Sequence, residues 1–331
     1  MDALSGVLRA VRLTGAVFFQ ADFTAPWALE SPESSMLAQA LLPDARQVVL
    51  FHLVRGGRCW VDVPGQPRIE LGPGDVIVFP LGDRHVMGSG AAEAVTPVTA
   101  LFPGPPPFVR PPRLAYGGGG AATGLVCGYL YLERVFFSPL FGTLPRVLVA
   151  RPDDGAAGAM LRSSAGILAA ALEGCETTSD ATPLDPSAPG GAEVLARLTE
   201  LLFVEVLRRH MAKLAPEEVG FFAAIRDPGV GRALEAFHRE PCRPWTVEQL
   251  ARQAAMSRSG FAARFVELLG ESPAQYTLRW RLRLAAQRLR ETTDSIAEVA
   301  TESGYASEAA FSRAFKREHG LAPGRFRSGP P

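Results

Sequence analysis

The sequence has few cysteines, no long hydrophobic run and no excess of charge of either sign. Its 331 residues include four cysteines, and 34 basic side chains balance 34 acidic ones. The cysteines are far apart and form no C-x-x-C pair, which argues against a disulfide framework and indicates a reducing compartment. No apolar stretch approaches the ~20 residues of a membrane helix. We therefore expect a cytoplasmic protein that does not contact the membrane.

The amino terminus also lacks a complete signal peptide. Arg9 and Arg12 precede an apolar run at 13–19, but the run stops at Gln20 and Asp22 without a small-residue cleavage site. This run is expected to be a first strand. The Gly-x-Ser-x-Gly, Gly-x-Gly-x-x-Gly, P-loop and His-Glu-x-x-His motifs are absent as well. The sequence thus carries no common catalytic or nucleotide-binding signature.

The zero net charge conceals an uneven distribution. Residues 225–331 carry 17 basic and 12 acidic side chains, so residues 1–224 carry 17 and 22. A basic end on an otherwise acidic chain indicates contact with nucleic acid at that end.

The pattern of elements predicts an α+β multidomain protein with three regions. Residues 1–150 contain β-rich runs at 48–54, 59–63, 75–79 and 125–132, separated by Gly and Pro. Residues 151–224 form a helical linker with helices at 156–172 and 192–214 and a flexible loop at 176–191. The second of these helices is amphipathic and either covers the strand region or forms a dimer seam. Residues 225–331 are helical throughout.

Two helix-turn-helix units are predicted in residues 225–331. In the first, helix 247–255 and a turn at 256–257 precede a helix that buries Phe261, Phe265 and Leu268. In the second, helix 295–303 and a turn at 304–306 precede helix 308–319, which buries Ala310, Phe311 and Phe315. The expected helix caps are Thr246, Ser257, Ser295 and Ser307.

The exposed face of each second helix is small or polar, as entry into a major groove about 12 Å wide requires. The first face carries Arg258, Ser259, Ala262 and Ala263, and the second carries Glu308, Ala309, Ser312, Arg313 and Lys316. The connecting helix 274–290 contains five arginines and no acid: Arg279, Arg281, Arg283, Arg288 and Arg290. These arginines, Arg279 and Arg283 in particular, are expected to contact DNA phosphates, unless they form the solvated face of a plain helical bundle.

Residues 227–327 resemble the AraC/XylS family of transcription regulators. The resemblance rests on the run Gly304 to Arg327 in the second unit and on Leu250-Ala251, Met256-Ser257, Phe265 and Gly270-Glu271-Ser272-Pro273 in the first. By position, the resemblance implies base contacts from Ser259, Ala262 and Ala263 and from Glu308, Ala309, Ser312 and Arg313. Because Ala263 stands where family members often carry a long polar residue, Ala262 and Ala263 are expected to touch thymine methyl groups instead.

Residues 4–149 resemble the cupin-type sensor half of one AraC subfamily. The run Gly74 to His85 is similar to the second cupin motif, and His52 stands at the first histidine of the first motif. The resemblance implies a β-barrel. Val54 and Cys59 occupy the positions of a second histidine and of the glutamate that cupin enzymes use as metal ligands, which argues against catalysis.

Four residues of the strand region allow two interpretations, a metal site or a buried core. His52, Cys59, His85 and Cys127 are a ligand set that suits tetrahedral Zn²⁺, and the alternative is that all four are buried core residues. Similarly, Trp27, Trp60, Phe51 and Phe79 either line an effector pocket or belong to the core.

The function expected from these features is sequence-specific binding of double-stranded promoter DNA, which requires no cofactor. RNA polymerase, an unknown small-molecule effector and a second copy of the chain are the expected partners, and no enzyme activity is expected. Two alternatives remain open: a cupin metalloenzyme with an accessory helical domain, and a DNA-binding protein without sequence preference.

Overall fold

In the computed structural model, the described residues are 2–11, 14–41, 48–105, 108, 111–131, 142–153, 155–173, 190–215 and 217–328. They divide into two compact units. The sheet unit comprises the described parts of 13–134 and 144–213, and the helical unit comprises those of 1–12, 135–143 and 214–331. Most of the expected loop at 176–191 lies outside the described residues.

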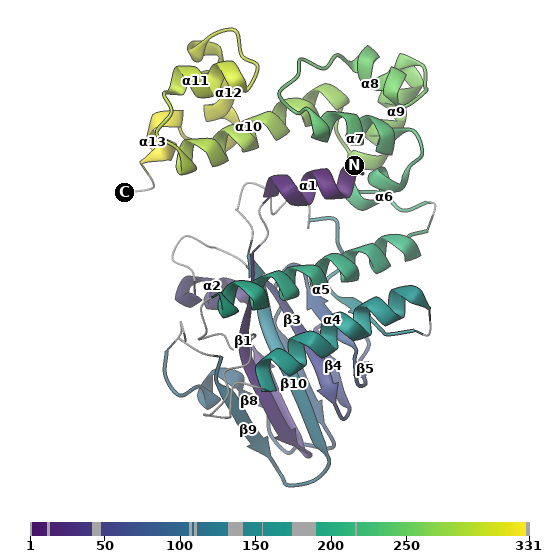
Figure 1. The fold of residues 1–331 in the computed structure, drawn as a ribbon, viewed down its shortest axis with the longest axis vertical. Helices are drawn as coiled ribbons and strands as arrows, with labels where there is room; N and C mark the ends of the chain where they lie inside the picture. The colour runs from purple at the N-terminus through teal and green to yellow at the C-terminus, as the bar shows by residue number, and fades with distance from the viewer. Residues whose placement is uncertain are drawn as a thin grey trace. The chain divides into compact units, whose positions relative to one another are not determined.

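The sheet unit consists of two β-sheets (Figure 1). The six-stranded sheet has the order β11-β6-β3-β10-β1-β9, and the five-stranded sheet has the order β5-β4-β7-β2-β8. In chain order these strands are β1 (Thr14–Thr24), β2 (Trp27–Ser31), β3 (Val49–Gly56), β4 (Cys59–Asp62), β5 (Ile69–Leu71), β6 (Val76–Phe79), β7 (His85–Ser89), β8 (Thr96–Pro97), β9 (Arg113–Gly117), β10 (Ala122–Tyr131) and β11 (Leu148–Ala150). Side chains of both sheets form one apolar core. The predicted cupin-like fold is confirmed.

Two long helices, α4 (Ala156–Glu173) and α5 (Gly191–Lys213), run side by side against the six-stranded sheet (Figure 1). The fit of α5 against β1 depends on Gly15, because a Cβ at that position would lie 2.7 Å from Cβ of Thr199. Leu202, Phe203 and Val206 of α5 are buried. The amphipathic helix predicted at 192–214 therefore covers the sheet. A short helix, α2 (Ser34–Leu41), follows β2.

The first helix of the chain, α1 (Ala3–Val11), packs with the helical unit, whereas we expected residues 1–150 to form one sensor region. Its buried side chains Ala3, Leu4 and Val7 follow the i, i+3, i+4 spacing of one helix face, and it contacts α7 (Val230–Arg239). The contact is close at Gly6, where an added Cβ would lie 3.2 Å from Cβ of His238. The helical unit thus draws on both ends of the chain.

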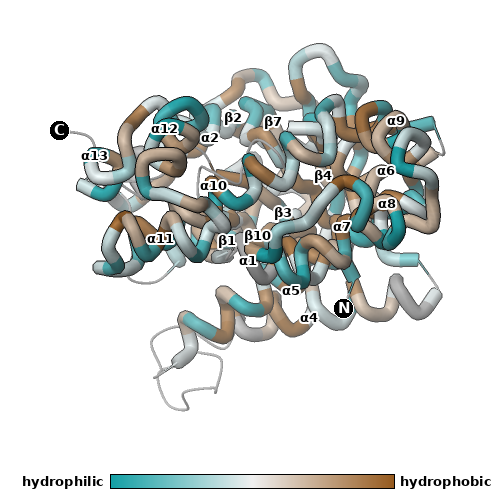
Figure 2. The backbone as a smooth tube through the Cα atoms, turned by 90° about the horizontal axis from the view of Figure 1, so that it is seen from above, coloured by the Kyte–Doolittle hydropathy of each residue, from teal (hydrophilic) through white to brown (hydrophobic). Residues whose placement is uncertain are grey.

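The remaining helices of this unit are α6 (Phe221–Arg226), α8 (Val247–Gln253), α9 (Arg258–Leu269), α10 (Pro273–Glu291), α11 (Ile296–Glu302), α12 (Glu308–His319) and α13 (Pro323–Arg327). Hydrophobic and hydrophilic residues alternate along them (Figure 2). All four predicted caps are observed: Thr246 and Ser295 form capping boxes, and Ser257 and Ser307 each accept one backbone N–H. Both predicted helix-turn-helix units are confirmed. None of the described helices is long and apolar enough to cross a membrane.

Candidate functional site

The two recognition helices, α9 and α12, turn equivalent faces inward. Phe261 and Phe265 of α9 and Phe311 and Phe315 of α12 are at most 1 % exposed. The ring centroids of the pairs lie 5.5 Å and 5.4 Å apart. Because an apolar pair at i, i+4 fixes which side of a helix is buried, the opposite side of each helix faces outward.

The outward faces carry the residues that the sequence assigned to DNA. Arg258, Ser259, Ala263, Glu308, Ala309, Arg313 and Lys316 are exposed, and Ala262 and Ser312 are half-buried. Apart from Arg258 the arrangement presents small side chains on α9, and apart from Ala309 it presents hydrogen-bonding or charged ones on α12. It suits insertion of both helices into major grooves.

The α10 arginines contact other segments of the helical unit. Arg279 donates to Glu271 and Glu318, and Arg281 donates to the backbone carbonyls of Pro241 and Arg243. The acids that pair with Arg279 thus lie outside α10 in the sequence. Its arginines fasten neighbouring segments to α10.

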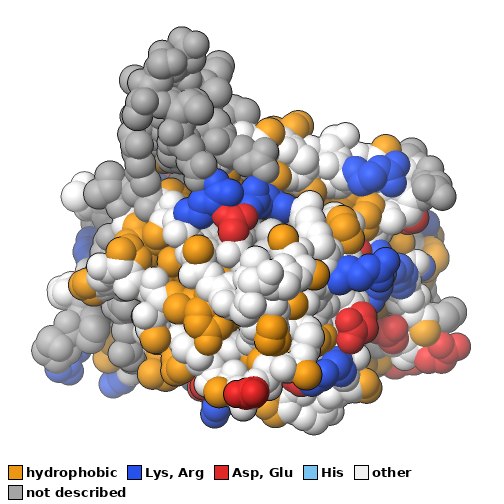
Figure 3. Space-filling view, turned by 90° about the horizontal axis from the view of Figure 1, so that it is seen from below, with side chains coloured by type: hydrophobic (Ala, Val, Ile, Leu, Met, Phe, Trp, Pro, Cys, Tyr) orange, Lys and Arg blue, Asp and Glu red, His pale blue; other side chains and the backbone are white. Residues whose placement is uncertain are grey.

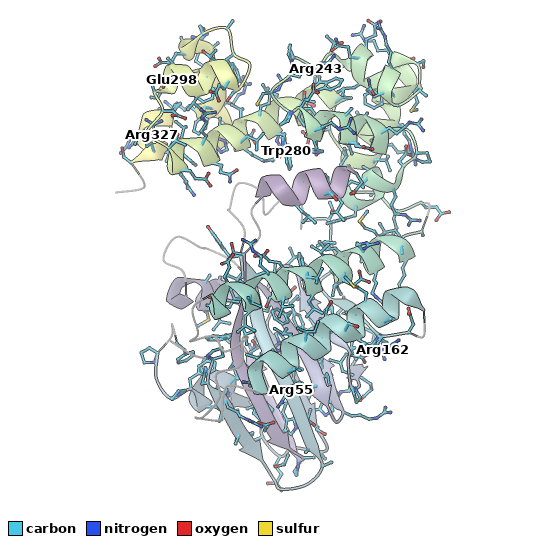
Figure 4. The ribbon with its side chains drawn as sticks, in the orientation of Figure 1. Arg55, Arg162, Arg243, Trp280, Glu298 and Arg327 are labelled. Carbon is cyan, nitrogen blue, oxygen red and sulfur yellow. The ribbon has the colours of Figure 1, made fainter. Side chains whose placement is uncertain are left out.

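The same holds at the carboxyl end of α10. Arg288 Nε lies 2.6 Å from Oδ2 of Asp294, and this arginine also pairs with Glu302. The Arg290 guanidinium lies 4.6 Å from the ring centroid of Phe326. From α13, Arg327 donates back to the carbonyl of Leu289 (Figure 4). These contacts hold α11 and α13 against α10.

One predicted DNA contact is wrong. Arg283 is 5 % exposed, and its Nη2 lies 3.8 Å from Oε1 of Glu318. Burial lowers its pKa, with the charge of Arg279 as a smaller cause. A guanidinium at this depth is not placed to reach a phosphate. Arg279 is half-exposed, so its contact with DNA stays a prediction.

The sheet unit shows no large basic patch on the face drawn in Figure 3, where basic side chains lie next to acidic ones. In this unit Asp22 pairs with Arg55 and Arg113, and Arg68 pairs with Asp62. Neutralised pairs of this kind attract polyanions weakly.

A chain of hydrogen bonds runs through the core of the sheet unit. His52 and Cys127 are neighbours on β3 and β10, with Nδ1 and Sγ 2.8 Å apart. Nε2 of His52 lies 2.9 Å from Nε2 of His85, which begins β7 in the other sheet. The Nδ1 of His85 lies 2.9 Å from the carbonyl of Asp83. Only one direction of donation satisfies every atom, because a carbonyl accepts only: Cys127 to His52, His52 to His85, and His85 to Asp83.

This direction requires neutral side chains, and burial favours them. Burial lowers the pKa of His52 well below its usual value and lowers that of His85 to about 4. Burial also raises the pKa of the Cys127 thiol well above its usual value. The ring of Phe79 stacks on His85 with centroids 3.7 Å apart. The cluster therefore ties the two sheets together while uncharged.

The predicted zinc site does not fit this arrangement. Both ring nitrogens of His52 are engaged in hydrogen bonds, with Cys127 and His85, whereas zinc needs a nitrogen with a free lone pair. Cys59, another predicted ligand, is buried on β4, where burial raises its pKa to about 12. Among the described residues, no group of three or more His, Cys, Asp or Glu is placed to hold a metal ion. Metal analysis of the purified protein tests the expectation.

A small apolar cavity opens beside this cluster. Of the four aromatic residues considered from the sequence, only Trp27 is among its lining residues. Its Nε1 is buried without a hydrogen-bond partner. Sequence reasoning missed the other lining residues, since strand periodicity places them in the core without showing where the core is hollow: Phe19, Phe23, Leu29, Ser31, Met87, Val98 and Leu125.

The comparisons with known proteins agree with this architecture. A family model described as Cupin matches residues 2–212, and one described as Helix-turn-helix domain matches residues 250–329. The chain is 33 % identical to an AraC-like transcription regulator of Streptomyces lividans over 87 % of its own length and 89 % of the relative's. It is 29 % identical to the HTH-type transcriptional regulator AlkR of Acinetobacter baylyi over 99 % of both chains.

A solved structure, the DNA-binding domain of AdpA in complex with a target DNA, is 31 % identical over 31 % of this chain and 91 % of that one, with a TM-score of 0.30. The curated relatives are regulators rather than enzymes, which favours regulation over the metalloenzyme alternative. The chain belongs to the AraC family of transcription regulators and joins a cupin sensor domain to a helix-turn-helix DNA-binding domain.

Proposed function

We propose that the protein reads two successive major grooves of promoter DNA, with α9 in one and α12 in the other. The observation that carries the proposal is the matched pair of recognition helices, each with its phenylalanines buried and a compact polar or small face exposed. The contact residues on α9 are Arg258, Ser259, Ala262 and Ala263. Those on α12 are Glu308, Ala309, Ser312, Arg313 and Lys316.

The test is selection of bound sequences from random DNA, followed by footprinting at fixed salt. Two protected elements about one helical turn apart on one face support the proposal. Equal affinity for all sequences contradicts the proposal and favours the alternative of a DNA-binding protein without sequence preference.

The two helices read DNA by different chemistry. Ala262 and Ala263 have only methyl groups to offer, which match the C5 methyl group of thymine, whereas Arg313 and Ser312 can hydrogen-bond to base edges. Replacing thymine by deoxyuridine in the selected site removes those methyl groups. We expect this replacement to weaken binding in the α9 element and to leave the α12 element unaffected.

We infer that the effector binds in the cavity of the sheet unit. Its lining is apolar, and the unpartnered Nε1 of Trp27 supplies a donor for an acceptor atom on the ligand. A compound that changes DNA affinity should also change the fluorescence of this tryptophan. Trp27→Phe, which removes the donor and keeps an aromatic ring, should weaken the response without abolishing DNA binding.

A second copy of the chain and RNA polymerase are the further proposed partners, acting in the cytoplasm. The outer sides of α4 and α5 expose apolar side chains seven residues apart, Met160 and Ile167 on one helix and Val194 and Leu201 on the other. Such stripes suit pairing with the same surface of another copy. Sedimentation of the full chain and of Ile167→Glu tests the dimer.

A further inference from the structure

One arginine of α10 contacts residues at the ends of both recognition helices. Its Nη1 lies 3.2 Å from Oε2 of Glu271, which directly follows Gly270, the C-cap of α9. Its Nε lies 3.2 Å from Oε1 of Glu318, the second-last residue of α12. The arginine is Arg279, so a single guanidinium joins the carboxyl ends of α9 and α12.

The surroundings make this contact stronger than an ordinary surface ion pair. The side chains of Glu271 and Glu318 are 19 % and 23 % exposed, and that of Arg279 is 43 % exposed. The buried Arg283 provides a second cation near Glu318. Linked and partly buried charges are screened less than isolated surface pairs. The planar guanidinium also fixes the directions of its two bonds.

A second tie holds only one of the two helices. Nε2 of His319, the last residue of α12, lies 3.2 Å from the carbonyl of Leu282 on α10. The end of α12 is therefore fastened to α10 at two points. The link from Arg279 to Glu271 extends the connection to the end of α9, so turning α12 relative to α9 breaks one of the two ion pairs.

We propose that Arg279, Glu271 and Glu318 form a clamp that sets the spacing and mutual angle of the two recognition helices. The clamp rests on the proposed reading of two grooves. Arg279 is a positioning residue in this role, because it acts on DNA through the two helices; a phosphate contact of its own is a separate prediction.

The clamp and simple electrostatics predict opposite signs for one substitution. Glu318→Gln removes a negative charge from a surface that approaches phosphates, so electrostatics alone predicts tighter binding. The clamp predicts weaker binding, because the two helices lose their fixed separation. It also predicts that the variant distinguishes less well between sites with different spacing of the two elements.

The experiment uses the full chain with the selected two-element site and with versions that carry one inserted or one deleted base pair. We expect Glu318→Gln and Glu271→Gln to lose about tenfold in affinity for the native spacing, a typical coupling for a side-chain network. Their loss on changing the spacing should be smaller than that of the wild type. Arg279→Lys should behave in the same way, because an ammonium keeps the charge without the planar fork.

Glu267→Gln is the matched control. It removes the same charge from α9, but Glu267 is exposed and pairs with Arg264 of its own helix. It should keep full spacing discrimination, and melting temperatures should show that every variant is folded. Glu318→Gln that binds as tightly as the wild type, with discrimination intact, overturns the clamp. A wild type indifferent to spacing overturns the proposed function itself, and the clamp with it.

Discussion

The two helix-turn-helix units share a motif but differ in what supports it. The first packs against α6, α7 and α10, with an aromatic group around His238, whose Nε2 lies 2.8 Å from the hydroxyl of Tyr276. Among the described residues, the second has a smaller core made with α10 and α13, in which the ring centroids of Phe315 and Phe326 lie 5.2 Å apart. Equivalent hydroxyl caps and identical phenylalanine spacings thus occur in two different packing environments.

The difference shows that a motif specifies its own turn and core but not its stability. The aromatic group of the first unit includes Phe237, from a helix that begins before the motif, and Trp280, from a helix that begins after it (Trp280 is labelled in Figure 4). The second unit packs against fewer helices outside its own motif. We therefore expect the two units to respond unequally to perturbation.

The largest effect should come from removing a core phenylalanine. Phe265→Ala and Phe315→Ala should each cost about 3–5 kcal/mol of unfolding free energy, because both side chains are fully buried. Hydrogen exchange should show lost protection in α8 and α9 for the first variant and in α11 to α13 for the second. Val266→Ala, at a 45 % exposed position, is the control. A folded Phe315→Ala protein with unchanged protection contradicts the assigned core.

Acid should weaken the first unit more than the second. Burial lowers the pKa of His238 to about 3 from 6.5, whereas the half-buried His319 is shifted less completely, because its contact with the Leu282 carbonyl opposes burial. Below pH 6.5 His238 is protonated in the unfolded chain but stays neutral in the folded protein. The contribution of His238 to the free energy of unfolding is therefore fully present above pH 6.5. It is lost as the pH drops towards 3 and amounts to a few kcal/mol, at about 1.4 kcal/mol per pKa unit.

The measurement for this prediction is unfolding free energy against pH, followed unit by unit through hydrogen exchange. His238→Gln removes the titrating ring and keeps a polar partner for Tyr276, so it should flatten the slope for the first unit. Equal slopes in the variant and the wild type between pH 6.5 and 4 contradict the assignment.

Mutations on α9 and on α12 should affect DNA recognition in different ways. Arg313→Ala should reduce affinity about tenfold and relax the preference at one base pair, since a bidentate arginine contact carries that much discrimination. Arg258→Ala should weaken binding to all sequences by a similar factor. This factor should be smaller than the loss of affinity caused by Arg313→Ala. Selection from random DNA with each variant measures both effects, and an unchanged preference for Arg313→Ala refutes its base contact.

The smallest expected effect concerns the turns. Ala255 has a φ of 55° in the first turn, and Gly304 has a φ of 81° at the matching place in the second. Left-handed backbone costs an alanine about 1 kcal/mol. Gly304→Ala should therefore destabilise its unit by about this amount, although the added Cβ meets neighbours only at 3.5 Å and beyond. Ala255→Gly should change stability by less, because relief of strain is offset by a more flexible unfolded chain. Thermal melting compares the two.

Features that depend on near neighbours in the chain could be predicted. The phenylalanine pairs, the serine and threonine caps and the alternating strands repeat at intervals of two to four residues, so their structural consequences are local. The same reasoning identified His52, His85 and Cys127 as interior residues. It could not supply their hydrogen-bond order, since His85 belongs to a different sheet from the other two.

By itself, the sequence determined two amphipathic reading helices behind capped turns and a barrel of alternating strands. Only the tertiary structure decided what the arginines of α10 do, where α1 packs, and where the barrel is hollow. The physical reason is distance along the chain: the partners of Arg279 stand 8 and 39 residues away, and no periodic pattern links such positions. Folding brings these charges together, and they then fix the arrangement of the parts that the sequence had already specified.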